Sequence, residues 1–252
     1  MFLFTPLEQF NQTPLLSLQV FSFDLTITQS TLILSLAILL CFLFLELLFL
    51  DECGFHIPNR WLLIFESFYD LCMTLVKDSI KGNIAQRYFS FIFVLFLFIL
   101  ICNLVGMVPY SFTPTSHLSF TLALSIMVFF GYHLICLREH GVRAFSLYYP
   151  SGVSLNLAPL IVPIELLARC SQVISLSVRL FANMMAGHTL LKVIAGFAWK
   201  MMFGGTFLFI AHIGTLAVLT ILIGLELSVA FIQAYVFVVL ASIYINDAHN
   251  LH

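Results

Sequence analysis

Two long apolar blocks near the carboxyl-terminal end restrict the fold of this chain more than any other feature. They cover about residues 160–202 and 206–248, and only Gly204-Gly205 separates them. As helices, each block would be about 60 Å long, whereas the hydrocarbon core of a bilayer is only about 30 Å thick. Ordinary tilts do not absorb that excess length. The sequence therefore predicts a hairpin of two helices that are strongly tilted, kinked or partly outside the lipid.

The rest of the chain also has the composition of a membrane protein. Of its 252 residues, 62% are hydrophobic and 9% are charged, whereas about a quarter are charged in a typical soluble domain. Segments 31–50, 88–107 and 118–137 each have the length of about 20 residues that crosses a bilayer. Within residues 53–87, apolar side chains recur at spacings of three and four, which indicates an amphipathic helix lying on the surface.

We therefore expect an all-α integral membrane protein. It should have about five membrane-embedded helices and one amphipathic surface helix, with the last two helices forming the long tilted hairpin. We treat residues 1–252 as one membrane domain. Its parts are a polar, proline-containing lead-in at 1–29, the first helices at 30–159, and the hairpin at 160–252.

Charge indicates the orientation and excludes some partners. Lysine and arginine are concentrated in segments 51–87 and 138–159, so the positive-inside rule places both on the matrix or cytoplasmic side. The N-terminus is then outside and, after five crossings, the C-terminus is inside. A net charge of −2 gives no reason to expect a nucleic-acid partner. The six cysteines form no CxxC pair, and we expect no cofactor and no metal.

An arginine lies deep inside the first long block, with apolar residues on both sides. The guanidinium of Arg179 does not lose its proton under biological conditions, and a fixed charge in hydrocarbon costs several kcal/mol. A structural alternative is an arginine whose side chain reaches the interface from a helix end. Because the interface is far from residue 179 in this block, we interpret Arg179 as part of a functional site.

The other strongly polar residues of the two blocks fall in facing pairs if the hairpin turns near residue 206. The pairs are Glu165 with Asp247, Arg179 with Gln233, and His188 with Glu226. Helical spacing places further candidates on the same two faces, because residues three and four apart share a face. These are Gln172, Ser175 and Asn183 beside Arg179, and Tyr244 beside Gln233.

The chemistry of these side chains suggests separate roles. Carboxylates and imidazole gain and lose protons, whereas a guanidinium does not. Two titratable clusters on opposite sides of a permanent cation are therefore better explained as two half-paths for protons than as one continuous path. A carrier whose carboxylate approaches Arg179 would give up its proton there. Since no unpaired acid of this chain is free to travel, we expect the carrier to be another subunit.

Three motifs resemble subunit a of the rotary ATP synthase in its mitochondrial form. They are SVRLFANMMAGH at 177–188, GLELSVAFIQAYVF at 224–237 and NLVGMVPYSF at 103–112. The resemblance covers nearly the whole chain, and the segments TPLEQF and YINDAHNLH look like plant or algal versions. A histidine at 188 with a glutamate at 226 is similar to the mitochondrial arrangement and differs from many bacterial ones.

The resemblance implies a stator subunit that moves protons and contains no catalytic site. In that family, two steeply tilted helices face a ring of c subunits, and the arginine matched by Arg179 faces the proton-carrying carboxylates of the ring. Glu165 and Asp247 match the half-channel on the matrix side, and His188 and Glu226 match the half-channel on the intermembrane-space side. Asn183 and Gln233 match further polar positions of the family.

The resemblance also implies partners and a location. The partners are the c-ring, the peripheral stalk, other membrane subunits of the complex, membrane lipids and protons. The location is the mitochondrial inner membrane, with the N-terminus in the intermembrane space and the C-terminus in the matrix. Arg169 lies one turn after Glu165 and is able to pair with it, but the resemblance assigns it no role.

Two other functions are compatible with a membrane protein that contains buried charges. A self-contained secondary transporter would show an internal inverted repeat with broken helices, and the sequence has no such repeat. A structural subunit of a respiratory complex would use its buried charges only to hold helices together. Copurification of a c-ring and a peripheral stalk would distinguish both from the stator subunit. A metal at His188 is a minor alternative, because one histidine and one glutamate fall short of a zinc site.

Overall fold

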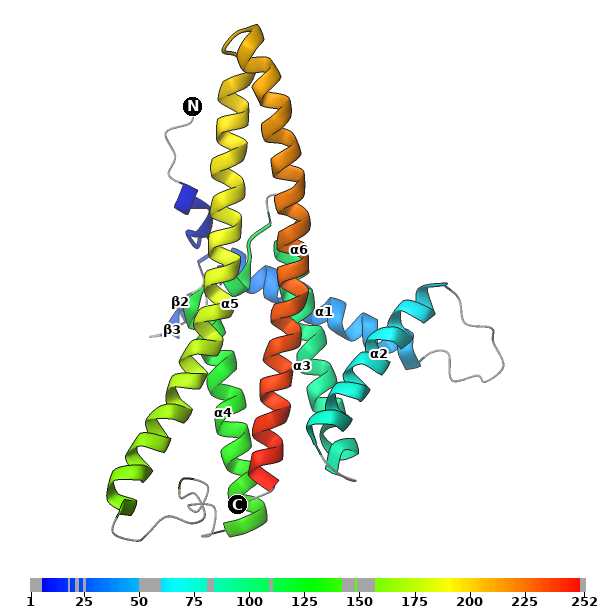
Figure 1. The fold of residues 1–252 in the computed structure, drawn as a ribbon, viewed down its shortest axis with the longest axis vertical. Coiled ribbons are helices and arrows are strands. Elements are labelled where there is room, and N and C mark those ends of the chain that lie inside the picture. The colour runs from blue at the N-terminus through cyan, green and yellow to red at the C-terminus, as the bar shows by residue number, and fades with distance from the viewer. Residues whose placement is uncertain are drawn as a thin grey trace.

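Two helices of nearly equal length form the longest feature of the structure. The computed structural model describes residues 6–17, 19–20, 23–24, 26–49, 60–80, 84–108, 111–141, 148 and 157–249. Helix α5 (Ala158–Met202, 45 residues) and helix α6 (Thr206–His249, 44 residues) lie against each other along the vertical axis of Figure 1. The turn between them contains Gly205, whose φ of +105° is a conformation that favours glycine. The predicted hairpin is confirmed.

Four further helices precede the hairpin. They are α1 (Gln29–Phe49), α2 (Arg60–Ser79), α3 (Ile84–Gly106) and α4 (Leu118–His140), with a short 3-10 turn η2 (Pro114–Ser116) before α4. Five of the described helices are long and apolar enough to cross a membrane, namely α1, α3, α4, α5 and α6. The predicted all-α membrane fold is therefore confirmed. Most of the polar segment at 138–159 lies outside the described residues.

Helix α2 has the amphipathic pattern that its sequence indicates. Cys72 and Val76 are fully buried on one face, where the helix packs against α3 and α6. Glu66, Asp70 and Lys77 are exposed on the other side. A helix with one apolar and one charged face is stable at a protein or membrane surface, in agreement with the prediction of a surface helix.

The lead-in contains more structure than the sequence indicated. A 3-10 turn η1 (Pro6–Phe10) comes first, followed by four short strands that form two antiparallel ladders. Strand β1 (Pro14–Leu16) pairs with β4 (Ile27–Thr28), and β2 (Gln19–Val20) pairs with β3 (Phe23–Asp24). These strands are only two or three residues long, too short for hydrophobic alternation to reveal them.

The core forms where α3 and α4 cover the hairpin. Helix α6 packs on α3, and α5 packs on α4. Large buried side chains fill the interface, among them Phe96, Ile92, Leu180, Phe237 and Ile245. Small residues recur along the buried face of α6 and are 0% exposed, which allows the neighbouring backbones to approach closely. They are Ala230, Ala234, Ala241 and Ala248.

A buried polar side chain joins two of these helices. Asn103 of α3 is 0% exposed, and its Nδ2 donates a hydrogen bond of 3.2 Å to the backbone oxygen of Ala230 in α6. Several histidines also make hydrogen bonds within or between these helices. Their partners are backbone oxygens or tyrosine hydroxyls: His133 with Phe129 and Tyr148, His140 with His249, His212 with Ala198, and His249 with Tyr88.

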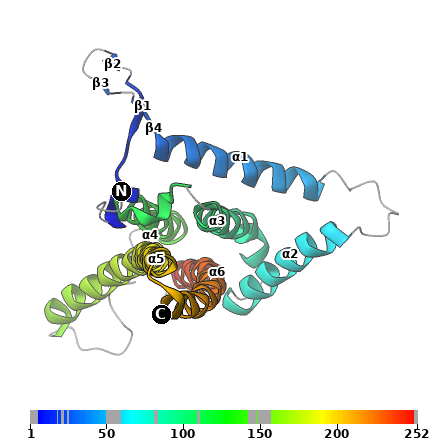
Figure 2. The same ribbon diagram turned by 90° about the horizontal axis from the view of Figure 1, so that it is seen from above.

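The direction of α1 constrains how the hairpin can lie in a membrane. Figure 2 looks along the hairpin, so that α6 and the later part of α5 are seen end-on, whereas α1 is seen from its side. The two directions thus differ by a large angle. With 21 residues, α1 is about 31 Å long and matches the bilayer core. If α1 crosses the membrane upright, the hairpin is strongly tilted, as its length also requires.

We predict that enlarging the buried face of α6 destabilises the protein. Ala241 is 0% exposed, so Ala241→Leu forces extra methyl groups into a filled interface, at a cost of about 1–3 kcal/mol. The purified protein should then unfold at a lower temperature in a thermal melt. Ala211→Leu, on the exposed side of the same helix, is the matched control and should leave the melting temperature unchanged. Equal melting temperatures for both variants would contradict this packing.

Candidate functional site

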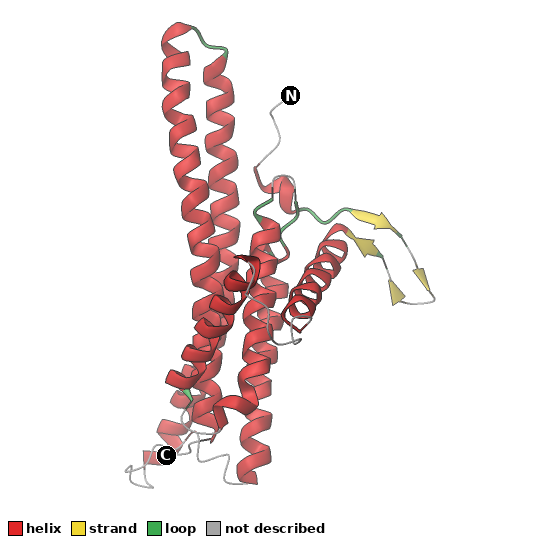
Figure 3. Cartoon of the chain, turned by 90° about the vertical axis from the view of Figure 1, so that its right-hand side faces the viewer, coloured by secondary structure: helices red, strands yellow, loops and turns green. Residues whose placement is uncertain are grey.

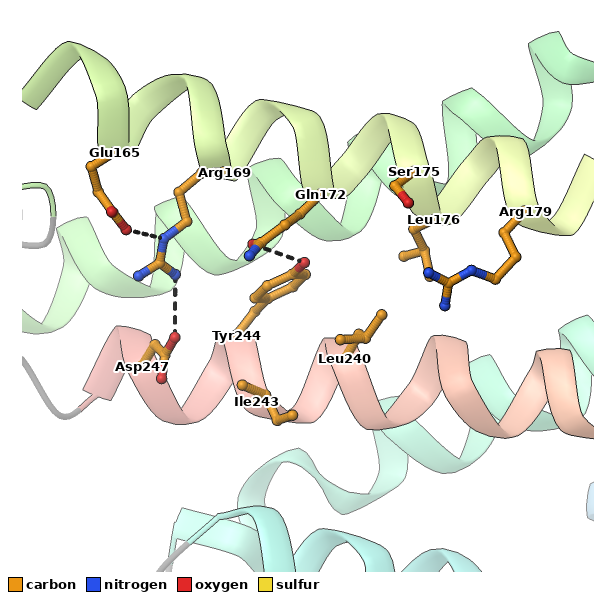
Figure 4. Close-up of a pocket in the computed structure, with 10 residues that line it drawn as sticks. All are labelled: Glu165, Arg169, Gln172, Ser175, Leu176, Arg179, Leu240, Ile243, Tyr244 and Asp247. Carbon is orange, nitrogen blue, oxygen red and sulfur yellow. Dashed lines mark hydrogen bonds and ion pairs between the residues drawn. The ribbon is translucent and has the colours of Figure 1, made fainter.

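A polar cavity lies between the two hairpin helices, where α5 diverges from α6 toward residue 158 (Figures 1 and 4). Its volume is about 330 Å³, enough for several water molecules. Helix α5 supplies most of the polar wall, and α6 supplies an acid, a phenol and two apolar side chains. The lining residues are Glu165, Arg169, Gln172, Ser175, Leu176, Arg179, Leu240, Ile243, Tyr244 and Asp247.

A cluster of three charged side chains closes one end of the cavity, and we call it the acid–arginine triad (Glu165, Arg169 and Asp247). Arg169 Nε donates to Glu165 Oε1 at 3.0 Å, one turn away on α5. Its Nη1 donates to Asp247 Oδ2 on α6 at 3.2 Å. The predicted proximity of Glu165 and Asp247 is confirmed, and Arg169 is the group that joins them.

The middle of the cavity is crossed by an uncharged hydrogen bond. The hydroxyl of Tyr244 donates to Gln172 Oε1 at 3.2 Å, so the two helices are also linked one level further along. Tyr244 stacks against Tyr132 of α4 with ring centroids 5.5 Å apart. The bond places Gln172 and Tyr244 at one height, which agrees with the predicted register of the hairpin.

Arg179 lies at the other end of the same cavity. Its side chain is exposed, and it makes no hydrogen bond or ion pair with any residue that the structure describes. The neighbouring Leu176 and Leu180 of the same helix are buried in the core, so the backbone at this level is held firmly. The arrangement presents a fixed cation at the hairpin surface, available to a group from outside the chain.

Two other residues that were expected beside Arg179 do not line this cavity. Asn183 is half-buried one turn further along α5, and Gln233 is half-buried on α6. Gln233 makes no hydrogen bond to Arg179. Ser175 does line the cavity with Arg179. The shared face on α5 is thus present, but the pairing of Arg179 with Gln233 is not a direct contact.

A second polar site lies beyond Arg179, toward the hairpin turn, and we call it the Glu226 site (Gly187, His188 and Glu226). A Cβ placed on Gly187 would lie 2.5 Å from Glu226 Oε1 and 3.2 Å from its Cγ. The carboxyl group therefore packs directly against the backbone of α5, in a space that only glycine leaves open. This contact confirms the predicted register at this level.

The polar atoms of the Glu226 site have no partners within the described chain. Both carboxyl oxygens of Glu226 and Nε2 of His188 are buried without a hydrogen bond. Buried polar atoms in native proteins are nearly always satisfied by protein or ordered water. These atoms therefore mark a place where water or a neighbouring subunit supplies the missing hydrogen bonds.

Helix geometry keeps the two sites apart. Glu165 precedes Arg179 by fourteen residues, or about 21 Å along α5, and His188 follows Arg179 by nine residues, or about 13.5 Å. The acids of the triad and of the Glu226 site therefore do not share one cavity. Arg179 lies between them along the hairpin.

Comparison with known proteins identifies the family. The family model described as ATP synthase A chain matches residues 30–246. The chain belongs to this family. It is 51% identical over 253 residues to ATP synthase subunit a of Pylaiella littoralis, covering 98% of this chain and 99% of that protein. It is 45% identical over 252 residues to the subunits a of Brassica napus and of Chondrus crispus, covering 98% of this chain and 97% of each.

Membership in the subunit a family decides between the functions left open by the sequence. The family is the proton-translocating subunit of the membrane sector of ATP synthase. A self-contained secondary transporter and a structural subunit of a respiratory complex are therefore set aside. Its plant and algal relatives and its five apolar helices make this chain a multi-pass protein of the mitochondrial inner membrane.

Sequence reasoning missed two features of these sites. It left Arg169 without a role beyond a local pair, because the bond to Asp247 joins residues 78 positions apart. It also missed Gly187, the residue that admits the carboxyl group of Glu226 against the backbone of α5. A glycine directly before His188 in a packed helix was the available signal, since glycine inside a helix is costly without a close neighbour.

We predict a disulfide between positions 187 and 226 when both are cysteine. The Cβ on residue 187 would lie 3.2 Å from Cγ of Glu226, so the two positions face each other closely, as a disulfide with its Cβ atoms about 3.5–4.5 Å apart requires. In a background without the native cysteines, oxidation of Gly187→Cys/Glu226→Cys should change the electrophoretic mobility of the protein, and reduction should restore it. Gly196→Cys/Glu226→Cys is the control, because residue 196 is about 13.5 Å further along α5. Cross-linking of both pairs with equal yield would show that the register is wrong.

Proposed function

We propose that the cavity and the Glu226 site are parts of two separate half-channels for protons, with Arg179 between them. The observation that carries the proposal is the position of Arg179, an unpaired cation at the end of a polar cavity whose other end holds two carboxylates. A permanent positive charge repels a proton that would pass directly along the hairpin. Protons then cross only if a carrier takes them from one side of Arg179 to the other.

The carrier is the c-ring, the partner implied by the family. A ring carboxylate that approaches the exposed guanidinium of Arg179 forms a charge-assisted hydrogen bond and gives up its proton. When the ring turns, the carboxylate leaves Arg179 and takes a new proton from the other half-channel before it enters lipid. Each proton therefore has to travel with the rotating ring, which couples proton flow to rotation and ATP synthesis.

The inner half-channel is the cavity with Glu165 and Asp247, and Gln172, Ser175 and Tyr244 line its wall. The outer half-channel contains His188 and Glu226. The unsatisfied buried oxygens of Glu226 support water at this place. Asn183 and Gln233 lie between the sites along the hairpin and contribute polar groups near the arginine.

The remaining parts of the proposal concern the whole subunit. The chain works as one membrane domain of the stator and carries no catalytic site, since its candidate groups accept, donate or repel protons and leave the chemistry of ATP to other subunits. Its N-terminus faces the intermembrane space and its C-terminus faces the matrix, as the distribution of Lys and Arg favours. Besides the c-ring, the peripheral stalk, other membrane subunits and lipids surround the exposed apolar surface.

The first experiment removes the central charge. Arg179→Ala should leave the complex assembled and abolish ATP-driven proton pumping, because nothing then forces the ring carboxylates to release protons in the right place. Arg179→Lys should restore little, since a point charge does not replace the planar fork of a guanidinium. The measurement is quenching of a pH-sensitive dye in vesicles that contain the complex.

The control for this experiment is Lys200→Gln, which removes an exposed cation from the same helix but outside the cavity. It should pump normally. Normal coupled pumping by Arg179→Ala would refute the separating role of the arginine.

A further prediction addresses the outer half-channel. His188→Ala/Glu226→Gln should slow proton exchange between the outer side and the ring by at least about tenfold, the loss typical of a removed proton-transfer group. Exchange with the inner side should persist. Proton flux in each direction, with the pH varied on one side at a time, separates the two.

Ser228→Ala, an exposed polar residue of the same helix, is the control and should have no effect. Unchanged flux in the double variant would mean that protons reach the ring by another route.

A further inference from the structure

Arg169 is the least exposed member of the triad. Its side chain is 16% exposed, whereas those of Glu165 and Asp247 are 35% and 31% exposed. The two carboxyl groups are therefore more accessible to solvent than the guanidinium that joins them. Figure 4 shows Arg169 between them, extended from α5 toward α6. A cation in this position does not relay protons, because it keeps its own.

Each acid of the triad gives one oxygen to Arg169 and keeps the other. Glu165 uses Oε1 and Asp247 uses Oδ2, so Glu165 Oε2 and Asp247 Oδ1 are left to exchange a proton with water. The guanidinium holds each oxygen in place through a separate nitrogen. One guanidinium thus joins two acids that belong to different helices, Glu165 of α5 and Asp247 of α6.

We propose that Arg169 is a positioning residue of the inner half-channel that binds Glu165 and Asp247 into a unit exchanging one proton at a time. The inference rests on the proposed inner half-channel. With both acids ionised the triad has one net negative charge, and one proton makes it neutral. Without Arg169 the two carboxylates would repel each other at close range, and the first proton would be held too firmly to be passed on.

The groups around the triad do not replace this charge. The other titratable side chains that interact with Arg169 are Tyr132 of α4, Tyr244 of α6, and Tyr148, which lies between α4 and α5 in the sequence. A phenol ionises near pH 10, so all three are neutral at physiological pH. Among these neighbours, only Arg169 therefore supplies a positive charge to offset the carboxylates of Glu165 and Asp247.

Arg169 would have a different effect if it were only a structural staple, that is, a salt bridge that holds α5 and α6 together without a role in proton exchange. A staple would lower the amount or stability of the complex when removed, but would leave the pH dependence of transport unchanged. A positioning residue would change the pH dependence in complexes that assemble normally. The substitution Arg169→Gln removes both the charge and the link between the acids, whereas Arg169→Lys keeps the charge without the planar fork, so the two variants together separate the two roles.

The experiment measures ATP-driven proton uptake from the inner side, in vesicles of the whole complex, as the inner-side pH is varied. For Arg169→Gln, we expect the half-maximal pH to move upward by about one unit or more, the shift typical of a carboxylate that loses an adjacent cation. ATP synthesis, which needs release to the inner side, should slow by at least about tenfold. Arg169→Lys keeps the charge and should stay near the original pH profile.

A second variant tests the charge balance directly. Glu165→Gln/Arg169→Gln removes one charge of each sign, so its pH profile should return toward that of the unchanged protein. Lys200→Gln is the control for the loss of one positive charge from α5 outside the cavity and should change nothing. If Arg169→Gln does not assemble, the double variant provides the measurement.

Three results would overturn the inference. One is an unchanged pH profile in Arg169→Gln, and another is a double variant no closer to the original profile than Arg169→Gln. A third is failure of Arg169→Lys to assemble, which would show a staple. The single variants Glu165→Gln and Asp247→Asn distinguish this from failure of the half-channel itself. If both transport normally, the half-channel proposal fails, whereas if both are impaired and Arg169→Gln is normal, only the role of Arg169 fails.

Discussion

A charge that cannot be neutralised is the constraint on which the rest of this structure depends. Arg179 must be tolerated inside an apolar hairpin, and it makes no ion pair within the described chain. The free energy of an exposed guanidinium in hydrocarbon is unfavourable by several kcal/mol. In the proposed mechanism, water in the cavity on one side and a partner carboxylate on the other relieve that cost. The polar face of α5, from Glu165 to Arg179, follows from this requirement.

The second arginine of the cavity solves a different problem. Arg169 has two acidic partners within the chain, so its charge is compensated locally, whereas we propose that the charge of Arg179 pairs with a carboxylate of another subunit. Ten residues of helix, about 15 Å, separate the two. In the proposed mechanism, one guanidinium positions fixed acids and the other promotes the release of protons from the moving ones. The same side chain serves both tasks because its planar fork binds carboxylates well and never titrates.

Most of the fold was accessible from the sequence because hydrophobic length and helical period are strong signals. The lengths of α5 and α6 predicted the hairpin, and its register followed from polar residues equidistant from the turn. The contacts that give the sites their form were harder to predict. The reach of Arg169 to Asp247 depends on side-chain rotamers, and the fit of Glu226 against Gly187 depends on how closely two backbones approach. Neither the rotamers nor the distance between the backbones produces a repeating pattern of residue types in the sequence.

The long hairpin is supported by other helices along only one half of its length. Figures 1 and 3 show α3 and α4 beside the lower half of α5 and α6, while the half nearest the turn rises beyond them. Under a sideways force, a rod that is held at one end bends most at its free end, here the hairpin turn, and least where it is held, here beside α3 and α4. Arg179 is flanked by Leu176 and Leu180, both buried in the core, so it belongs to the supported half of the hairpin. Sideways force from a moving neighbour would therefore bend the tip while the arginine keeps its position.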